Sequence, residues 1–286
     1  MNPGTLYICA TPIGNLEDIT YRVLRCLREV DLIAAEDTRN SIRLLNHFEI
    51  KTPMTAYHEY NKYDKARYLV QELLNGKNIA IITDAGTPCI SDPGEELVRQ
   101  AAEAGIVITS LPGPAACITA LTLSALPTRR FAFEAFLPAE KKERQEILAE
   151  LSRETRTMIV YEAPHHLRKT LAELAETLGE DRRISLCREL TKTHEESIRT
   201  TLGDAIAKYE AEEPRGEYVL VIEGKSREAL RQEAIEDWTA MPLADHMQHY
   251  LDQGLSEKDA MKAVAKDRGL GKREVYQAWK VAGEEE

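Results

Sequence analysis

The sequence has 286 residues, of which 43% are hydrophobic and 30% are charged. This balance excludes an intrinsically disordered chain and leaves room for two globular domains of ordinary size. The formal net charge of −11 argues against a protein that binds free nucleic acid non-specifically, because such binding depends on basic residues that neutralise phosphates.

No apolar run approaches the length of a membrane span, and the N-terminal residues carry no basic stretch followed by an apolar one. We therefore expect a cytoplasmic protein without a membrane partner. The five cysteines lie far apart and form no C-x-x-C pair, so we expect buried, reduced thiols rather than a zinc site or a disulfide framework. The pair His165-His166 lacks a third ligand nearby, and no metal site is predicted.

Short apolar runs alternate with amphipathic stretches over the first two-thirds of the chain, which is typical of α/β proteins. Several of these runs are continuous and rich in β-branched residues, as expected for strands that are covered on both faces. In chain order, the predicted strands are Leu6–Ala10, Leu32–Ala35, Ile79–Thr83, Val107–Ser110, Met158–Tyr161, Ile184–Cys187 and Tyr218–Glu223.

Capping and turn residues delimit four predicted helices between these strands. From the N-terminus, they are Asp64–Leu74 with Asp64 as its cap, Glu95–Ala104 after Pro93-Gly94, His165–Leu178 after Pro164, and Ala205–Glu210 after Asp204.

The segment Leu111-Pro112-Gly113-Pro114 interrupts the alternation near the middle of the chain, and the βαβ rhythm restarts after it. We place a domain junction there, which predicts a first domain over 1–113 and a second over 114–225. Polar helix formers take over near Gly224, so 226–286 is predicted to be a small helical tail. The breaks in this tail are expected at Pro242, Gly254 and Gly269.

Three loops that follow predicted strands have the composition of ligand-binding turns. The longest, Thr83–Gly94, combines glycines, prolines, aspartates and hydroxyl side chains, which fix an unusual backbone path and permit close approach to a ligand. Asp84 at the strand tip is suited to accept hydrogen bonds from ribose hydroxyls or to counter a positively charged ligand. The alternative is an ordinary turn in which Ser91 or Asp92 caps a helix.

The other two loops are Cys9–Asn15, after the first strand, and Pro112–Ala116 at the domain junction. Cys9–Asn15 lacks the G-x-G-x-x-G pattern of a conventional dinucleotide-binding turn. The small residues of Pro112–Ala116 allow a cofactor to lie against the backbone, although a hinge between domains explains them equally well. The chain has no GxxxxGK[ST] loop, GxSxG elbow or HExxH motif, which excludes a P-loop nucleotide hydrolase.

Taken together, six ordered motifs resemble the tetrapyrrole methylase superfamily of S-adenosylmethionine-dependent methyltransferases. The resemblance extends from about Leu6 to Gly224, and the tail matches more loosely. The motifs are Ala10-Thr11-Pro12-Ile13-Gly14-Asn15-Leu16, Ala34-Ala35-Glu36-Asp37-Thr38-Arg39, Tyr57-His58-Glu59-Tyr60-Asn61, Ser91-Asp92-Pro93-Gly94, Tyr161-Glu162-Ala163-Pro164-His165 and Arg188-Glu189-Leu190-Thr191-Lys192.

The resemblance implies the two-domain α/β fold of class III S-adenosylmethionine methyltransferases, with a small helical C-terminal tail added here. It also implies S-adenosyl-L-methionine bound in the cleft between the domains, and a homodimer. The cofactor-binding residues that we expect on this basis are Pro12, Asp84, Ala85, Gly86, Thr87, Ile90, Gly113, Pro114, Ala115, Ala116, Tyr161 and Glu162.

Within the superfamily, the motifs are most similar to a bacterial branch that methylates 16S ribosomal RNA. This implies methylation of the 2′-hydroxyl of a cytidine in 16S rRNA, with the small ribosomal subunit as the partner. Tetrapyrrole-modifying members carry a G-x-G-x-G-D first loop, and the different loop in this chain, Ala10–Asn15, disfavours a tetrapyrrole substrate. The alternatives are methylation of a tetrapyrrole precursor or a modified protein residue, and a non-catalytic ribosome-binding factor with the same fold.

A ribose hydroxyl is a poor nucleophile until its proton is removed, and acidic and imidazole side chains gather in the N-terminal half of the chain. We expect Glu36 or His58 to act as the base. Arg39 and Asn61 are expected to hold the RNA backbone, since a guanidinium donates to phosphate in pairs. The alternative is that Glu36, Asp37 and Arg39 form a structural ion-pair network at a helix start.

An acidic protein that acts on RNA needs local basic patches. The first candidate is the stretch from Arg129-Arg130 through Lys141-Lys142 to Arg144.

The second candidate is the tail segment Lys258–Lys280, in which Tyr276 and Trp279 lie among basic residues. Such aromatic side chains can stack on unpaired bases. The alternative is an amphipathic helix whose Val275, Tyr276 and Trp279 face packs on the body of the protein or on a dimer partner.

Overall fold

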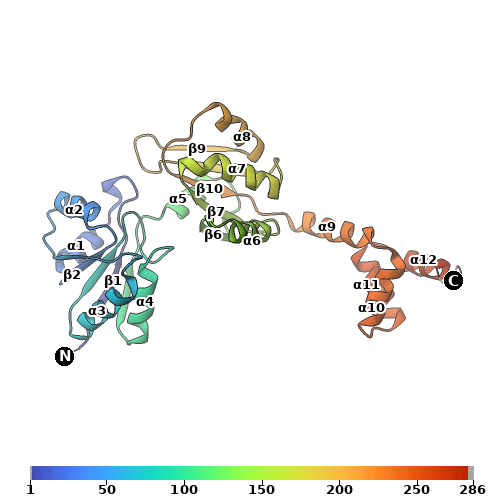
Figure 1. Cartoon of the computed structure of the whole chain (residues 1–286), viewed down its shortest axis with the longest axis horizontal. Helices are drawn as coiled ribbons and strands as arrows, with labels where there is room; N and C mark the ends of the chain where they lie inside the picture. Colours follow the sequence, from blue (N-terminus) through green and yellow to red (C-terminus); the bar gives the residue numbers. More distant parts are fainter. Residues whose placement is uncertain (1, 283–286) are drawn as a thin grey trace. The chain divides into compact units, whose positions relative to one another are not determined.

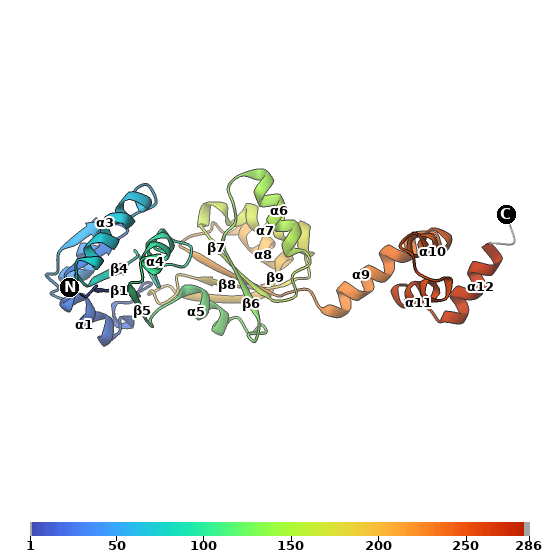
Figure 2. The ribbon, with the colours of Figure 1, turned by 90° about the horizontal axis from the view of Figure 1, so that it is seen from below.

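The computed structural model describes residues 2–282 (Figures 1 and 2). Residue 1 of the predicted first domain and residues 283–286 of the predicted tail lie outside the described part. The chain divides into two compact units, of which the first comprises residues 1–149 and 156–223 and the second residues 150–155 and 224–286. The first unit contains two five-stranded sheets, and the second is helical.

The first sheet is wholly parallel and has the strand order β3-β2-β4-β1-β5. Every residue of β4 is buried, as expected for a central strand that is covered on both faces. The strands are β1 (Thr5–Cys9), β2 (Leu32–Ala35), β3 (Met54–Ala56), β4 (Ile79–Ile82) and β5 (Val107–Leu111).

The helices that connect these strands cover both faces of the sheet (Figure 1). One face packs against α1 (Tyr21–Glu29) and α2 (Thr38–His47), and the other packs against α3 (Lys62–Leu74) and α4 (Gly94–Glu103). The short helix η1 (Leu16–Asp18) precedes α1. Because all five strands are parallel, their carboxyl ends meet at one edge, which is where open α/β sheets bind ligands.

The second sheet is mixed and has the order β6-β7-β10-β8-β9, in which only the β6–β7 pair is parallel. Its strands are β6 (Phe131–Phe136), β7 (Thr157–Glu162), β8 (Arg183–Arg188), β9 (Glu196–Thr201) and β10 (Tyr218–Ile222). Its helices are α5 (Ala116–Leu123), α6 (Lys141–Leu151), α7 (Pro164–Leu178) and α8 (Leu202–Ala211). The apolar side of α5 packs on β7, β8 and β10 through Cys117, Ala120 and Leu121.

The second unit is built around a small apolar cluster that contains Met247, Val264 and Val275. The ring of Trp238 stacks on that of buried His246 with centroids 4.0 Å apart, and Trp279 packs against the cluster. The helices are α9 (Arg227–Ala240), α10 (Leu243–Asp252), α11 (Glu257–Asp267) and α12 (Lys272–Ala282). Between residues 2 and 282, no helix is both long and apolar enough for a membrane span.

The predicted fold class is confirmed, as are all seven predicted strands, whose bounds differ from the observed ones by no more than a residue. The helical tail is also confirmed, with breaks at the three expected positions. Two helix starts were predicted wrongly. The third helix of the chain begins at Lys62 rather than at Asp64, and Thr201 rather than Asp204 caps α8.

The polar and irregular elements of the fold were not predicted. The strand β3 has only three residues, β9 is a polar edge strand, and β6 shifts register between Phe133 and Phe136, beside Ala135 with φ 52°. The helices α1, α2, α5 and α6 were also missed. The five cysteines are free, and all but Cys89 are buried.

Arg144 is the centre of a buried polar network rather than part of an exposed basic patch. Its side chain is 8% exposed; Nε donates to Glu173 (2.7 Å) and one guanidinium nitrogen donates to the Thr170 hydroxyl (2.7 Å). The other nitrogen reaches the carbonyls of Leu137 and Pro138. Arg144 is therefore not available to RNA, which corrects one member of the predicted patch.

We expect Arg144→Met to lower the free energy of unfolding by about 3 kcal/mol, because it leaves a partly buried carboxylate and a buried hydroxyl without their donor. Urea denaturation measures this change. Arg130→Met, at an exposed site, is the control and should change stability by less than about 0.5 kcal/mol. Equal effects of the two variants would show that the network does not stabilise the fold.

Candidate functional site

The three loops predicted to bind a ligand leave three adjacent strands, β4, β1 and β5. Backbone hydrogen bonds join the first two loops: the Thr11 N–H donates to the Gly86 carbonyl (2.8 Å), and the Gly86 N–H donates to the Thr11 carbonyl (3.0 Å). The Thr87 hydroxyl then donates to the Pro114 carbonyl (2.9 Å). The loops therefore form one connected layer at the carboxyl edge of the first sheet.

Glycines are required at two points where the loops approach one another. Gly86 has φ 86°, and a Cβ atom there would lie 3.3 Å from the Ile13 side chain. A Cβ atom on Gly113 would lie 2.6 Å from that of Ala10, which no real pair of atoms tolerates. Gly113 depends on the absence of a side chain, whereas Gly86 depends on its positive φ and has little space beside Ile13.

The Thr83–Gly94 loop is held in shape by Asp92. Its carboxylate accepts hydrogen bonds from the N–H groups of Cys89 (2.8 Å) and Gly94 (2.6 Å), and Gly94 is the first residue of α4. Burial raises the pKa of Asp92 above its usual value. Cys89 and Ser91 adopt positive φ values of 70° and 59°, a conformation that few residues without special support maintain. Asp92 therefore binds the first N–H of α4, whose N-cap residue is Pro93, and it also lines a cavity.

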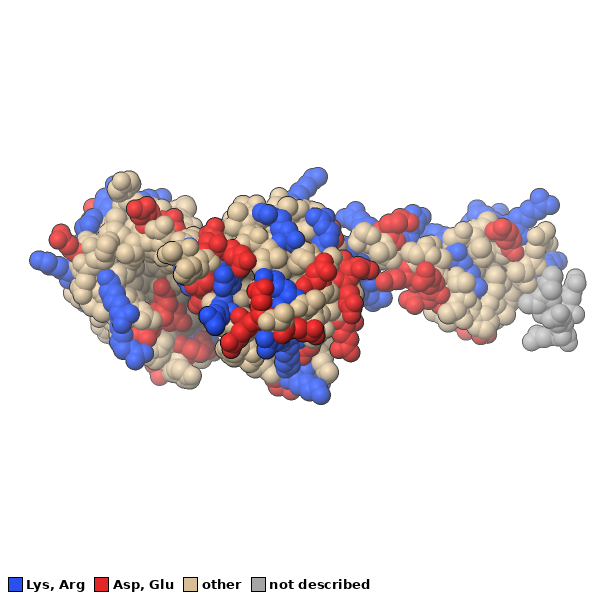
Figure 3. Space-filling model, turned by 90° about the horizontal axis from the view of Figure 1, so that it is seen from above, with Lys and Arg blue, Asp and Glu red and all other residues tan. Residues whose placement is uncertain are grey.

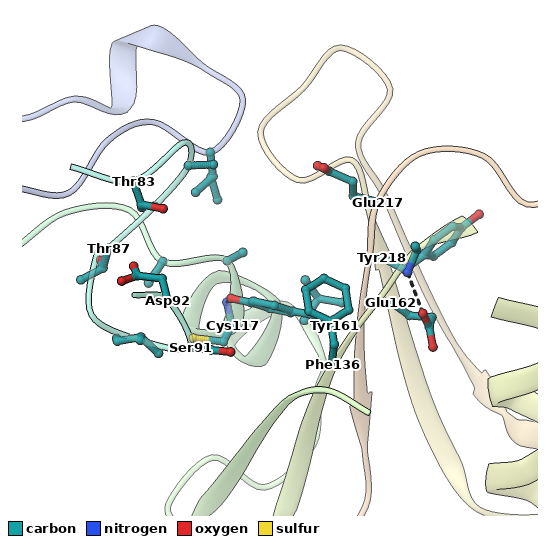
Figure 4. Close-up of a pocket in the computed structure, with 18 of the residues that line it drawn as sticks. Thr83, Thr87, Ser91, Asp92, Cys117, Phe136, Tyr161, Glu162, Glu217 and Tyr218 are labelled. Carbon is teal, nitrogen blue, oxygen red and sulfur yellow. Dashed lines mark hydrogen bonds between the residues drawn. The ribbon is translucent and has the colours of Figure 1, made fainter. Parts of the chain in front are cut away.

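That cavity, which we call the cleft cavity, has a volume of about 370 Å³ and is bounded by both sheets of the first unit (Figure 4). Figure 4 shows Thr83, Thr87 and Asp92 on the side of the first sheet and Glu217 on the side of the second. Its volume is in the range of pockets that bind small molecules and cofactors. The lining residues are Ile13, Glu36, Thr83, Ala85, Gly86, Thr87, Ile90, Ser91, Asp92, Ala115, Ala116, Cys117, Phe136, Tyr161, Glu162, Ala163, Glu217, Tyr218 and Val219.

The charge of the cleft cavity is one-sided. Four carboxylate residues line it, and the described lining residues include no lysine, arginine or histidine. In Figure 3, acidic side chains lie in the hollow between the two α/β parts of the first unit, and basic side chains lie close by at its edges. A site of this kind favours a cationic ligand and disfavours a phosphate.

Eight of the twelve predicted cofactor-binding residues line the cleft cavity: Ala85, Gly86, Thr87, Ile90, Ala115, Ala116, Tyr161 and Glu162. Gly113 and Pro114 are not among the lining residues, although they shape the connected loops. Pro12 and Asp84 line a separate hollow beside the cavity.

Asp84 makes contacts that its position in the sequence does not reveal. Its carboxylate accepts hydrogen bonds from the Asp37 N–H (3.2 Å) and from the Asn40 side-chain amide (3.0 Å). In this structure Asp84 therefore ties the end of β4 to the beginning of α2.

Glu162 and Tyr161 approach the cavity in different ways. The Glu162 carboxylate accepts from the Ala163 N–H (2.8 Å, dashed in Figure 4) and from the buried Thr170 hydroxyl, which joins it to the Arg144 network. The Tyr161 hydroxyl accepts from the Cys117 N–H (3.1 Å), at the start of α5, and burial raises its pKa. Tyr161 thus fixes the position of α5 on the cavity wall.

Several lining residues were missed because no local motif marks them as part of a site. Phe136 lies at the end of the irregular strand β6 and makes an edge contact with Tyr161, with ring centroids 5.7 Å apart. Tyr218 and Val219 begin β10, and Glu217 directly precedes that strand. Only the folding of the second sheet brings them to the loops of the first.

Of the four predicted catalytic residues, Glu36 alone is among the residues that line the cleft cavity. It follows β2, and its carboxylate accepts a hydrogen bond from the Thr83 hydroxyl (2.6 Å). The backbone N–H of His58 donates to the Asn61 side-chain oxygen (2.9 Å), and this bond stabilises the loop that contains both residues. Nδ1 of His58 is buried without a hydrogen-bond partner in the described chain.

Arg39 pairs with its neighbour Asp37 on the surface. Its side chain is 89% exposed and lies 2.7 Å from the Asp37 carboxylate, which also caps α2 through the Arg39 N–H. The Arg39 hydrogen bonds lower the pKa of Asp37 to about 2. The alternative of an ion pair at a helix start therefore describes Asp37 and Arg39, whereas Glu36 bonds to Thr83 instead.

In the second candidate RNA patch, Lys258–Lys280, some side chains of the predicted apolar face are buried and one is exposed. Val275 is buried and Trp279 packs within the cluster of the second unit, where its indole N–H donates to Glu257 (3.0 Å). Tyr276 is exposed, with the Lys280 ammonium 5.7 Å from its ring centroid.

Comparison with known proteins establishes the family. The profile described as Tetrapyrrole (Corrin/Porphyrin) Methylases matches residues 5–206. The chain belongs to the tetrapyrrole methylase family. This methylase therefore uses S-adenosylmethionine as its methyl donor, as the resemblance implied.

Curated relatives match the methylase over almost its full length. It is 46% identical over 273 residues to "Ribosomal RNA small subunit methyltransferase I" of Halalkalibacterium halodurans, covering 96% of this chain and 93% of the relative. It is 44% identical over 278 residues to the protein of the same name in Bacillus subtilis, covering 97% and 94%.

Solved structures share the fold of the methylase at low sequence identity. Diphthine synthase has a TM-score of 0.61 at 14% identity, covering 80% of this chain and 95% of that one. Uroporphyrin-III-C-methyltransferase from Thermus thermophilus has a TM-score of 0.55 at 18% identity, covering 76% and 94%. These similarities concern the fold alone.

The residues of the cleft cavity fit S-adenosylmethionine. Carboxylates on the wall suit the positive sulfonium and ammonium groups of that cofactor. Of the four, Glu217 is ion-paired with Lys192 (2.9 Å), which is not a lining residue. The small residues Ala85, Gly86, Ala115 and Ala116 expose backbone for close approach, and Ile13, Ile90, Phe136 and Val219 offer an apolar surface for a purine ring. Within the described residues, no group of three or more His, Cys, Asp or Glu is arranged to hold a metal ion.

We expect Ala85→Leu to weaken S-adenosylmethionine binding at least about tenfold, because Ala85 is an exposed residue of the cavity wall and the larger side chain fills cavity space. Isothermal titration calorimetry measures the affinity. Ala102→Leu, at an exposed position of α4, is the matched control and should bind as the wild type does. Wild-type affinity in Ala85→Leu would place the cofactor elsewhere.

The ion pair between Asp37 and Arg39 leads to a prediction about how stability depends on pH. The pKa of Asp37 is about 2 in the folded chain, below the value of about 3.9 for a free aspartate. The stabilisation that its ionised form contributes is therefore complete above pH 4 and is lost as the pH falls toward 2. In Arg39→Gln, the Asp37 carboxyl should titrate closer to pH 4 in a carbon-13 NMR experiment, whereas Arg67→Gln should leave it unchanged.

Proposed function

We propose that this methylase transfers the methyl group of S-adenosylmethionine to the 2′-hydroxyl of a cytidine in 16S ribosomal RNA. The proposal rests on relatives that are 43–49% identical and carry the name of a small-subunit ribosomal RNA methyltransferase. It further includes the small ribosomal subunit as the partner and a homodimer as the active form, as the family resemblance implies. It also includes the cytoplasm as the location, as the lack of an apolar span and of an export signal in the sequence led us to expect.

The observation that carries the chemistry is the position of Glu36. Its carboxylate lies on the wall of the cleft cavity, and a hydrogen bond from Thr83 orients it. The oxygen that does not accept from Thr83 retains capacity to take a proton from a hydroxyl in the cavity. His58 and Asn61, by contrast, are not among the residues that line the cleft cavity, so we assign the role of base to Glu36.

Bound S-adenosylmethionine supplies an electrophilic methyl carbon, and its sulfur retains the electron pair of the carbon–sulfur bond that breaks. The protein contributes alignment and proton removal. The connected loops Thr83–Gly94 and Pro112–Ala116 fix the shape of the cavity wall. Glu36 accepts the proton of the ribose 2′-hydroxyl while the ribose 2′-oxygen forms the new bond to the methyl carbon. The apolar residues Ile13 and Phe136 limit the access of water, which would compete for the base.

The first loop and the degree of similarity favour RNA over a tetrapyrrole. The uroporphyrin-modifying neighbour is only 18% identical, whereas the ribosomal RNA methyltransferases are 43% identical or more. A tetrapyrrole precursor is therefore the comparison substrate in the test rather than a second proposal.

We expect Glu36→Gln to lower kcat for methylation of small ribosomal subunits by about 100-fold or more, because the amide keeps the Thr83 hydrogen bond but cannot accept the proton. Transfer of tritium from labelled S-adenosylmethionine measures kcat, and calorimetry should show unchanged cofactor affinity. Glu29→Gln, at an exposed position of α1, should retain wild-type turnover.

The chemical position of the methyl group tests the proposed acceptor. A 2′-O-methyl group blocks alkaline cleavage at its own nucleotide, so the labelled RNA should yield an alkali-resistant dinucleotide that contains a methylated cytidine. Label in an alkali-labile nucleotide, or labelling of a porphyrinoid and not of the subunit, would overturn the proposed function. Full turnover in Glu36→Gln would overturn the role of Glu36 alone.

A further inference from the structure

A second hollow lies between the loop after β1 and the helix α2, and no role has yet been given to it. We call it the α2 hollow; its volume is about 350 Å³. The residues that line it are Thr11, Pro12, Gly14, Leu16, Asn40, Ser41, Arg43, Leu44, His47, Thr83 and Asp84.

The α2 hollow and the cleft cavity are separated by the thickness of a single loop. Pro12 and Gly14 line the hollow, whereas Ile13 between them lines the cavity. Thr83 lines both, and beyond it the chain alternates in the same way, with Asp84 on the hollow and Ala85 on the cavity. A chain molecule that enters the cavity therefore has the hollow within reach.

The two spaces differ in the charged side chains that line them. The cleft cavity is lined by carboxylates, whereas Arg43 and His47 line the α2 hollow, four residues apart and thus on one face of α2. Both side chains are exposed, and neither forms an ion pair with the chain over residues 2–282. The one carboxylate of the hollow, Asp84, already accepts hydrogen bonds from Asn40 and from the N–H of Asp37. The Arg43 guanidinium is therefore exposed and not ion-paired, and Asp84 is the one carboxylate on the same wall.

The wall of the α2 hollow also contains a buried hydroxyl group that has no hydrogen-bond partner within the described chain. Ser41 is 4% exposed, yet its Oγ atom has no hydrogen-bond partner within the described chain. Buried hydroxyls in folded proteins are nearly always bonded, so an unsatisfied one on the wall of a hollow indicates a group that arrives with a ligand. A phosphate oxygen accepts from both a hydroxyl and a guanidinium.

We infer that the α2 hollow binds a backbone phosphate of the RNA strand next to the acceptor nucleotide, with Arg43 and Ser41 as its donors. The inference rests on the proposed function and extends it to the part of the substrate that the acidic cavity cannot hold. A single strand carries one phosphate per roughly 3.4 Å of helix axis. A ribose in the cavity thus presents a neighbouring phosphate beyond the Pro12–Gly14 loop.

The α2 hollow then determines which strand geometry is accepted. The acceptor ribose enters an acidic space and the adjacent phosphate enters the hollow that holds Arg43, so only a strand that spans the intervening loop satisfies both. This arrangement assigns the phosphate contact to Arg43, whereas Arg39, one turn earlier on α2, is already paired with Asp37.

The test compares Arg43→Gln and Ser41→Ala with Arg67→Gln. Arg67 is an exposed arginine of α3, on the opposite face of the sheet, and its loss removes the same charge. Ser41→Ala removes no hydrogen bond within the described protein, so it should fold as the wild type does. The probes are small ribosomal subunits for methylation and a single-stranded RNA heptamer for binding.

We expect Arg43→Gln to raise KM for the subunit about tenfold or more with little change in kcat, and to leave S-adenosylmethionine affinity unchanged. The slope of log Kd against log salt for the heptamer should decrease by about one, the signature of a lost phosphate contact. Ser41→Ala should raise KM in the same direction, and Arg67→Gln should match the wild type.

The outcomes separate the two proposals. If the wild type methylates the subunit and Arg43→Gln behaves like Arg67→Gln, the phosphate site is overturned while the proposed function stands. If the wild type does not methylate the subunit, the proposed function is overturned. In that case, a heptamer affinity and salt slope that depend on Arg43 still support the phosphate site, and equal binding by both arginine variants overturns it as well.

Discussion

The site depends on one pair of backbone hydrogen bonds, between Thr11 and Gly86. It joins the loops that leave β1 and β4, and the bond from Thr87 to Pro114 adds the loop after β5. Gly86 makes this possible because its positive φ and its missing side chain let the two backbones pair beside Ile13. The cleft cavity, the α2 hollow and the thin partition between them all follow from this contact.

The methylase places acidic and basic side chains in two neighbouring parts of its surface. A cationic cofactor and an anionic RNA strand need opposite environments, yet the chain as a whole has a net charge of −11. Carboxylates gather around the cleft cavity, while Arg43 and His47 are placed on one face of α2 beside it. The overall charge then disfavours indiscriminate RNA binding and leaves selection to a substrate that fits both spaces at once.

The sequence predicted the parts of the site whose signal is local. Apolar runs marked the strands, and the glycine- and proline-rich stretches after them marked the loops, because both signals lie within a few residues. It could not predict Phe136 or Glu217, which reach the cavity only when the second sheet forms, nor the bonds that join Asp84 to Asn40. Arg144 was misjudged for the same reason, since its partners Thr170 and Glu173 are distant in the chain.

The placement of the indole rings has a practical consequence. The chain contains two tryptophans, and both Trp238 and Trp279 belong to the helical second unit. Because Trp238 stacks on His246 and Trp279 packs on the apolar cluster, emission excited selectively at these rings reports the state of that unit alone. Far-ultraviolet circular dichroism reports the backbone of both units together. A single transition shared by emission and dichroism would therefore indicate that the two units melt together, and separate transitions would indicate that they melt in succession.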